Sequence, residues 1–240
     1  MKIDVFAICY NEEFMLPYFI RHYKQFASNI TVYDNLSTDK SVELMEEAGI
    51  KVIPYDTGGK LDESTYLNIK NNAWKDSKAD WVIVCDIDEF IYHPQIIKIL
   101  SEVRATYITP EGYEMISEDL PTKNFHIYDE LKFGIPSKPY SKPCIFKPND
   151  IIETNLIVGA HIARPTGNII SMKDSGIKLL HYKYINREVI FKRYSIYAKR
   201  QTGEAKHEGW GDYSTQSQTN LNNKFDGWLA IAKNIIDSKI

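Results

Sequence analysis

Residues 81–90 read W-V-I-V-C-D-I-D-E-F. The first five residues form a short apolar run rich in β-branched and aromatic side chains, which is typical of a strand buried on both faces of a parallel sheet. The carboxylates Asp86, Asp88 and Glu89 follow where that strand is expected to end. Because side chains alternate along an extended segment, we expect Asp86 and Asp88 to share one face while Glu89 points away.

This pair of carboxylates predicts a divalent metal site. Two carboxylates on one face repel each other unless a cation lies between them. Hard oxygen ligands suit Mg²⁺ or Mn²⁺, and a carboxylate-held ion with open coordination positions commonly carries substrate phosphates. A structural alternative stays open, because acidic residues at a strand end also serve as solvated loop residues or as the N-cap of a following helix, here expected over residues 94–100.

Strands and helices alternate through the residues that precede this stretch. Strands are expected over residues 3–9, 30–33 and 51–55, and helices over residues 14–26, 41–48 and 62–75. This order predicts an α/β fold with a single doubly wound, mostly parallel sheet of Rossmann-like type. The pattern is less regular after residue 107. A strand over residues 177–182 that ends in His181, a helix over 186–201 and a last helix over 225–236 are expected there.

Polar residues follow three of the predicted parallel strands. Asn11 and Glu12 come after the first, Asp34 after the second, and Asp86 and Asp88 after the fourth. Ligands of open α/β sheets bind at the carboxyl ends of the strands, so these side chains predict a cleft for a polar ligand. Neither a Gly-x-Gly-x-x-Gly turn after the first strand nor a Gly-Lys-Ser/Thr loop occurs, which disfavours ordinary dinucleotide and P-loop binding.

Length and composition set outer bounds on function. A chain of 240 residues with 43% hydrophobic and 25% charged residues suits one soluble domain. A net charge of −3 does not favour binding to nucleic acid. Cys9, Cys85 and Cys144 form no close cluster and are expected to be buried and reduced. No apolar stretch approaches the length of a membrane span, and the N-terminus is too acidic for a secretory signal, so we expect a cytoplasmic protein.

Three segments together resemble the family 2 type of nucleotide-sugar-dependent glycosyltransferases, whose catalytic domain has the glycosyltransferase A fold. They are Y-N-E-E at residues 10–13, D-N-x-S-T-D-x-S at residues 34–41 and D-I-D-E-F at residues 86–90. The resemblance covers about the first 90 residues. It implies a single domain over residues 1–240, with a nucleotide-sugar-binding half at 1–106 and an acceptor-side half at 107–240.

The resemblance also implies roles for individual residues. A nucleoside-diphosphate sugar, with a UDP-sugar favoured, is bound by Tyr10, Asn11, Glu12, Asp34 and Asp86, and Mn²⁺ or Mg²⁺ by Asp86 and Asp88. The ion bridges the diphosphate and stabilises the leaving nucleotide. Lys70 either adds a contact to the diphosphate or is a solvated helix lysine.

A histidine from the second half often completes such a metal site in members of this fold. His181 is the preferred candidate because it ends a predicted strand, and His161 is the competitor. An inverting enzyme also needs a carboxylate to accept the proton of the acceptor hydroxyl. Asp119, in the adjacent pair Glu118-Asp119, is the candidate base, with a surface turn before Pro121 as the alternative.

Basic and aromatic residues alternate in the helix expected over residues 186–201. The helix either covers an anionic donor, contacts a lipid-linked acceptor at the inner face of the membrane, or is an ordinary amphipathic helix. Trp210, between two glycines, is either a lid over the sugar or a packed loop residue.

The predicted function is therefore metal-dependent transfer of a sugar to a hydroxyl on a glycan or lipid-linked acceptor. A nucleotidyltransferase is one alternative, although it would normally carry a Gly-rich, basic loop where this chain has Asn-Glu-Glu. A non-catalytic nucleotide- or glycan-binding domain of the same fold is the other.

Overall fold

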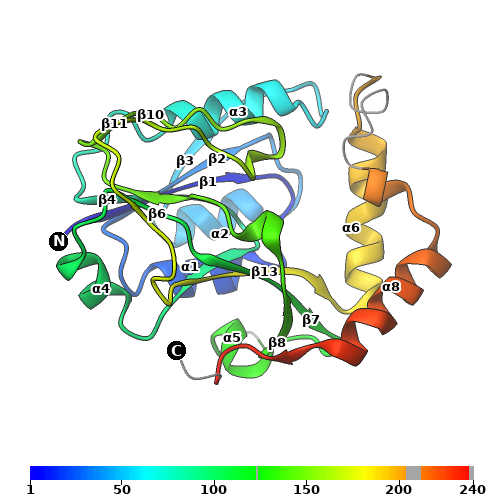
Figure 1. Ribbon diagram of the computed structural model, residues 1–240. Helices are drawn as coiled ribbons and strands as arrows, with labels where there is room; N and C mark the ends of the chain where they lie inside the picture. The colour runs from blue at the N-terminus through cyan, green and yellow to red at the C-terminus, as the bar shows by residue number, and fades with distance from the viewer. Residues whose placement is uncertain (123, 204–211, 238–240) are drawn as a thin grey trace.

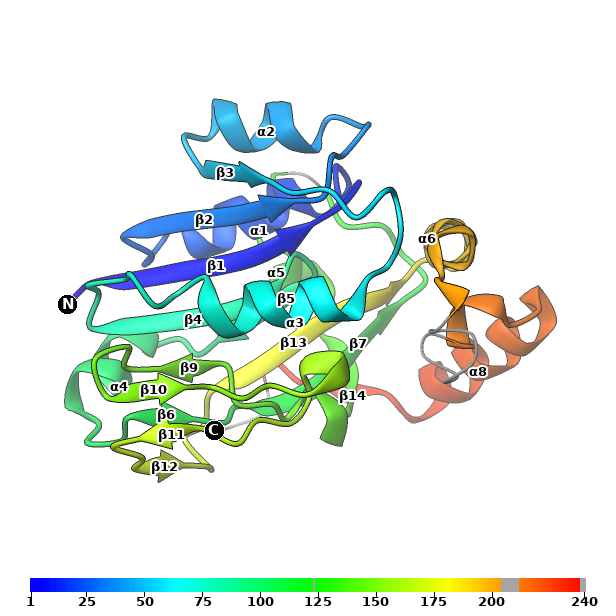
Figure 2. The same cartoon turned by 90° about the horizontal axis from the view of Figure 1, so that it is seen from above.

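Parallel strands form the centre of the molecule (Figures 1 and 2). The structure is a computed structural model that describes every residue except 123, 204–211 and 238–240. The parallel strands β1 (Ile3–Cys9), β2 (Asn29–Asp34), β3 (Lys51–Pro54) and β4 (Trp81–Asp86) alternate with helices α1 (Leu16–Tyr23), α2 (Ser41–Glu47) and α3 (Glu63–Asn72). The predicted α/β class with a mostly parallel central sheet is confirmed.

Three short strands extend this sheet beyond β4. They are β6 (Tyr107–Ile108), β9 (Ile145–Phe146) and β12 (Ser171–Met172), and the order across the sheet is β12-β6-β9-β4-β1-β2-β3. Apolar side chains cover both faces of β4. Ile83 and Cys85 belong to the main core, whereas Val82 and Val84 pack with Trp74, which follows α3. The burial of both faces explains why this strand is an unbroken apolar run.

A second, five-stranded sheet accompanies the single sheet that the sequence predicts. Its order is β14-β8-β7-β13-β5, with β5 (Glu89–Tyr92), β7 (Glu111–Ser117), β8 (Phe133–Pro136), β13 (Lys178–Ile185) and β14 (Lys233–Asn234). A turn of only two residues, Ile87 and Asp88, separates β4 from β5. The chain therefore leaves the first sheet and enters the second within the acidic stretch, a change of sheet that the local pattern could not reveal.

The remaining elements belong to neither of these sheets. They are α4 (Ile96–Glu102), α5 (Ile127–Glu130), β10 (Ile151–Glu153), β11 (Thr166–Gly167) and the 3₁₀ turns η1 (Lys138–Tyr140), η2 (Val158–Ala160) and η3 (Asp212–Thr215). Strands β10 and β11 pair with each other as a separate antiparallel sheet. Cys9, Cys85 and Cys144 are buried free thiols, as predicted.

Helices α6 (Arg187–Arg200) and α8 (Gln218–Ile231) form a layer at one end of the molecule (Figure 1). Asn186 caps α6, because its side chain accepts hydrogen bonds from the backbone amides of Glu188 and Val189, as predicted for this helix. The last helix begins at Gln218 and not at residue 225. The two helices share a small apolar cluster that is separate from the main core. None of the helices within the described residues is long and apolar enough to cross a bilayer.

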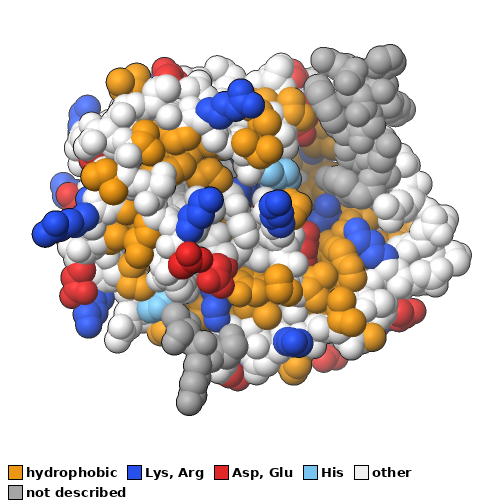
Figure 3. Space-filling model, viewed as in Figure 1, with side chains coloured by type: hydrophobic (Ala, Val, Ile, Leu, Met, Phe, Trp, Pro, Cys, Tyr) orange, Lys and Arg blue, Asp and Glu red, His pale blue; other side chains and the backbone are white. Residues whose placement is uncertain are grey.

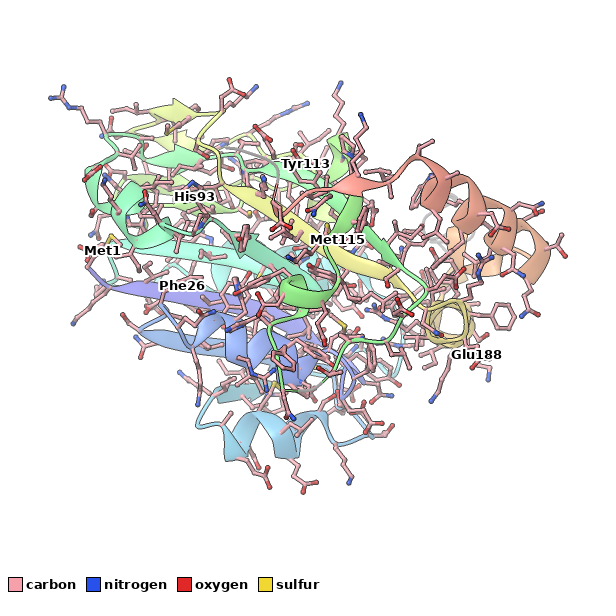
Figure 4. All side chains as sticks on the ribbon, turned by 90° about the horizontal axis from the view of Figure 1, so that it is seen from below. Met1, Phe26, His93, Tyr113, Met115 and Glu188 are labelled. Carbon is pink, nitrogen blue, oxygen red and sulfur yellow. The ribbon has the colours of Figure 1, made fainter. Side chains whose placement is uncertain are left out.

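Strand β7 is buried through its middle. Glu114, Met115 and Ile116 are buried, whereas Tyr113, nearer the start of the strand, is half-buried (Figure 4). Gly112 lies against the backbone of η1, so that a Cβ atom built on it would be 2.1 Å from the carbonyl carbon of Tyr140. The Gly112 amide also donates a hydrogen bond, 2.9 Å long, to the hydroxyl of Ser141, the residue that follows η1. The absence of a side chain at residue 112 therefore allows η1 to reach the cleft described below.

We predict that Gly112→Ala lowers the free energy of unfolding by about 3 kcal/mol, because the backbone of η1 would have to move. Gly227→Ala is the matched control. Gly227 lies within α8 with open space around its Cα, so this change should stabilise the protein by up to ~1 kcal/mol. Urea unfolding of both variants measures the two effects. Similar stability changes in both variants would contradict the assigned close approach.

Candidate active site

One cleft of about 590 Å³ opens at the carboxyl ends of β1 and β4. Its size is in the range of small-molecule sites. The cleft lies between the first sheet and α6, and basic side chains gather along this hollow in Figure 3. Predicted site residues line it together: Tyr10, Glu12, Lys70, Asp86, Asp88, His161 and His181. These seven predicted residues are less than a third of the lining, and their roles in binding stay predictions.

Hydrogen bonds interlock the loops after β1 and β2 at one rim of the cleft. The Asn11 amide donates to the Ser37 hydroxyl at 2.8 Å, and the Asn11 side-chain oxygen accepts from the Thr38 amide at 2.7 Å. The Asp34 carboxylate accepts from both the amide and the hydroxyl of Ser37 at 2.8 and 2.6 Å. The side chains of Asn11 and Asp34 thus hold the loops and lie outside the lining, so donor binding by these two residues stays a prediction.

Asp86 is held by lysines from distant segments. Lys70 on α3 lies 2.7 Å from its carboxylate, and Lys142, after η1, lies 3.7 Å away. Lys142 is buried and pairs more closely with Glu89, at 2.6 Å. Glu89 in turn accepts a hydrogen bond from the Asp86 amide at 3.0 Å. Asp86 faces the cleft while Glu89 is turned inward, as predicted, although the cause is the turn at residues 87–88 and not strand alternation.

Asp88 is held by a different set of groups. Its Oδ2 atom lies 3.0 Å from a guanidinium nitrogen of Arg193 on α6 and 3.4 Å from Nε2 of His181 on β13. Burial raises the pKa of Asp88, but His181 and Arg193 outweigh it and hold the pKa well below its usual range. The same Arg193 nitrogen lies 2.7 Å from Glu12. Burial nonetheless raises the pKa of Glu12 to about 7.

His181 is held by a carboxylate at the edge of its ring and by an aromatic ring stacked on its face. Its Nδ1 lies 2.7 Å from Glu114 on β7, and the ring of Tyr140 stacks on it at 3.9 Å between centroids. Burial lowers the pKa of His181, but Glu114 and Asp88 raise it, and the net pKa is about 9. His161 meets the edge of Tyr140 at 5.2 Å between centroids. In the part of the chain that the structure describes, His181 and not His161 approaches Asp88.

Arg200 closes the other end of the cleft. Its guanidinium lies 3.3 Å from the centre of the Tyr10 ring, and its Nε donates to the carbonyl of Gly59 at 3.1 Å. It also donates to the hydroxyl of Tyr66 at 3.2 Å. In contrast, Lys192 and Lys199 on the same helix are exposed. The side chains of α6 that line the cleft are thus Arg193, Tyr197 and Arg200, and a membrane contact of the helix stays a prediction.

Other predicted residues lie elsewhere. Asp119 is exposed beyond the end of β7 and is not part of the lining, so its assignment as the base stays a prediction without support from the geometry. Glu188, a further acidic residue of α6, is exposed on the outside of the helix (Figure 4). Trp210 lies outside the described residues.

Sequence reasoning missed Lys142, Glu114 and Tyr140. Glu114 directly precedes the apolar residues Met115 and Ile116. A glutamate in such a position is expected to be buried and paired, and this was the available sign that it belongs to the site.

The donor atoms at Asp88 fit a divalent cation in part. Asp88 and His181 present an oxygen and a nitrogen 3.4 Å apart, and Glu114 on Nδ1 is the usual partner of a metal-bound imidazole. Because the pKa of His181 is about 9, its Nε2 has to release a proton before it can bind a cation. Mg²⁺ commonly uses one or two protein ligands and takes the others from phosphates and water. No three His, Cys, Asp or Glu side chains among the described residues are arranged as a complete metal site. The protein therefore supplies an incomplete set of ligands, which a diphosphate could complete.

Comparison with known proteins gives a partial match. No family model matches the chain. Over 88 residues the chain is 34% identical to an uncharacterized glycosyltransferase of Rickettsia bellii (strain RML369-C), which covers 37% of this chain and 28% of that protein. The chain is therefore similar to a glycosyltransferase in part of its length.

Solved structures with a similar arrangement include TarS of S. aureus, residues 1–349. TarS is 16% identical with a TM-score of 0.47, and the match covers 83% of this chain and 65% of that one. Glucosyl-3-phosphoglycerate synthase from Mycobacterium tuberculosis, in complex with Mn²⁺, UDP and glucosyl-3-phosphoglycerate, is 17% identical with a TM-score of 0.34. That match covers 47% of this chain and 44% of the synthase. This chain thus spans less than two thirds of each of these proteins.

We predict that Lys142→Met lowers the free energy of unfolding by about 3–5 kcal/mol, because it leaves the buried Glu89 carboxylate without its cation. Adding Glu89→Gln, whose carbonyl can still accept from the Asp86 amide, should recover more than half of the loss. Lys75→Met is the matched control. Lys75 pairs with Glu153 at the same 2.6 Å, but at the surface, and should contribute about 0–1 kcal/mol. Equal losses for the two lysines in urea unfolding would contradict the importance of the buried pair.

Proposed function

We propose that this protein transfers a sugar from a nucleoside-diphosphate donor to a hydroxyl group of an acceptor, with a divalent cation. One observation carries the proposal: Asp86 and Asp88 at the end of β4 line a single cleft together with Tyr10 and Glu12 at the end of β1. The carboxyl ends of adjacent parallel strands are where α/β folds bind ligands. The partial match to a glycosyltransferase supports the same class.

The charges of the cleft suit a diphosphate. Lys70, Lys183 and Arg193 line it and supply positive charge, and Tyr10 and Tyr66 supply rings. In our proposal Asp88 and His181 hold Mn²⁺ or Mg²⁺, which when bound stabilises the negative charge on the departing nucleotide. Lys70 and Asp86 orient the donor beside it. Following the resemblance, a UDP-sugar is the favoured donor, and a glycan or lipid-linked hydroxyl is the favoured acceptor.

We predict that Asp88→Asn lowers metal-dependent release of nucleotide by about 100-fold or more, because it removes an anionic ligand at the position where charge develops. The assay measures nucleotide released from a panel of nucleoside-diphosphate sugars with Mn²⁺. Asp129→Asn, an exposed carboxylate on α5, is the control and should leave release unchanged. Equal release by wild type and Asp88→Asn would remove Asp88 from the mechanism.

The same assay with a hydroxyl acceptor tests the predicted base. If Asp119 accepts the acceptor proton, Asp119→Asn should lower transfer by about 10²–10⁴-fold while donor binding is retained. Unchanged transfer would assign the base to another group. Stabilisation of the wild type by UDP in a thermal-shift experiment, without any nucleotide release, would favour the non-catalytic binding domain over the enzyme.

A further inference from the structure

A single nitrogen of Arg193 lies between two carboxylates that come from separate parts of the chain. The nitrogen is 2.7 Å from Oε1 of Glu12, in the loop after β1, and 3.0 Å from Oδ2 of Asp88, in the β4–β5 turn. The hydroxyl of Tyr197 lies 3.2 Å from the same nitrogen. Three oxygen atoms therefore surround one positively charged nitrogen.

The surroundings of this nitrogen resemble those of a bound cation. The three side chains that form the ion pairs are largely buried, at 15%, 11% and 10% exposure for Arg193, Glu12 and Asp88. Without a cation between them, the two carboxylates would repel each other with little screening by solvent. The same Oδ2 atom of Asp88 lies 3.4 Å from Nε2 of His181, the nitrogen assigned to the proposed metal site. The guanidinium and a metal ion would thus compete for the same carboxylate oxygen.

Helix α6 is attached so that its cleft-facing side chains can rearrange. Its apolar contacts, through Ile190 and Tyr194, belong to a cluster that contains Leu221 and Phe225 of α8 and Ile116 and Tyr184 of the second sheet. The contacts that Arg193 makes with the first sheet are polar and involve its side chain only. A flexible arginine side chain can therefore leave the two carboxylates without disturbing the apolar packing of the helix.

We infer that Arg193 is an internal counter-cation that occupies the position of the divalent ion and is displaced when the ion binds. The inference rests on the proposed function, because it uses the metal site assigned there. A guanidinium stays charged at every physiological pH, so it offsets part of the negative charge of Glu12 and Asp88 whenever the metal is absent. Once displaced, its planar set of donors matches the oxygens of a diphosphate.

Removal of this arginine should strengthen binding of the metal alone. We expect Arg193→Gln to bind Mn²⁺ at least about tenfold more tightly than the wild type when no nucleotide is present, since a competing positive charge is gone. Isothermal titration calorimetry measures this affinity. Arg187→Gln is the matched control, because Arg187 lies on the same helix and pairs with two carboxylates, Glu118 and Asp226, that do not line the cleft. The control should bind Mn²⁺ as the wild type does.

Equal or weaker Mn²⁺ binding by Arg193→Gln would overturn the inference. A second measurement on the wild type avoids dependence on the folding of the variant. The guanidinium NMR signal of Arg193, assigned by its absence in the variant, should shift on titration with Mg²⁺, whereas the signal of Arg187 should not. A signal of Arg193 that is unchanged at saturating Mg²⁺ would also overturn displacement.

Failure of this inference and failure of the proposed function give different results. If the wild type releases nucleotide with Mn²⁺ but Arg193→Gln binds Mn²⁺ no more tightly than the wild type, the transferase proposal stands and the inference about Arg193 is wrong. If Arg193→Gln binds Mn²⁺ more tightly but wild type releases nucleotide from no donor in the panel, the counter-cation stands and the transferase proposal is wrong.

Discussion

Charge compensation inside the cleft is the constraint on which the arrangement of this molecule depends. Several carboxylates lie within or directly behind the cleft: Glu12, Asp86, Asp88, Glu89 and Glu114. Each is within ion-pair distance of a lysine, arginine or histidine from a remote segment. Breaking one such buried pair costs about 3–5 kcal/mol, because a buried charge is left alone. The cleft can therefore exist only when the second sheet and α6 are folded against the first sheet.

This balance also bears on the ligand. The positive groups nearest the two aspartates already pair with carboxylates, Lys70 with Asp86 and Arg193 with Glu12 and Asp88. Arg200, at the other end of the cleft, donates to the Gly59 carbonyl and the Tyr66 hydroxyl instead. A diphosphate placed beside Asp86 and Asp88 would therefore compete with these carboxylates for the same cations. A divalent cation that enters with the diphosphate would supply the missing positive charge there, which is why the proposed function includes a metal.

The sequence predicts the features of this structure that depend on local patterns. The alternation of β1 to β4 with their helices follows from the spacing of apolar residues, and the start of α6 follows from the capping residue Asn186. The convergence of Glu12, Asp86 and Asp88 follows from the rule that parallel strands end at one edge. These inferences need only neighbouring residues and a topological rule. The α/β class and the acidic part of the cleft lining could be predicted for that reason.

The partners of the acidic residues could not be predicted in the same way, because they arise from contacts between residues far apart in the chain. Asp88 and Arg193 are separated by 105 positions, and Lys142 reaches Glu89 from an irregular segment without periodicity. The second sheet was missed because β5 follows β4 after only two residues, which looks like a continuation of one strand.

The motif residues show how far a sequence resemblance reaches. Asn11 and Asp34 belong to the segments that resemble glycosyltransferases, yet their side chains bind the backbone and hydroxyl groups of the neighbouring loop. These motif positions thus specify how two loops are held together at the rim. The residues that line the cleft also include His181, Arg193 and Arg200, which lie outside the segments that carry the resemblance. Both halves of the chain therefore shape the cleft, and changes in β13 or α6 would alter its lining while the hydrogen bonds of these loop motifs stayed intact.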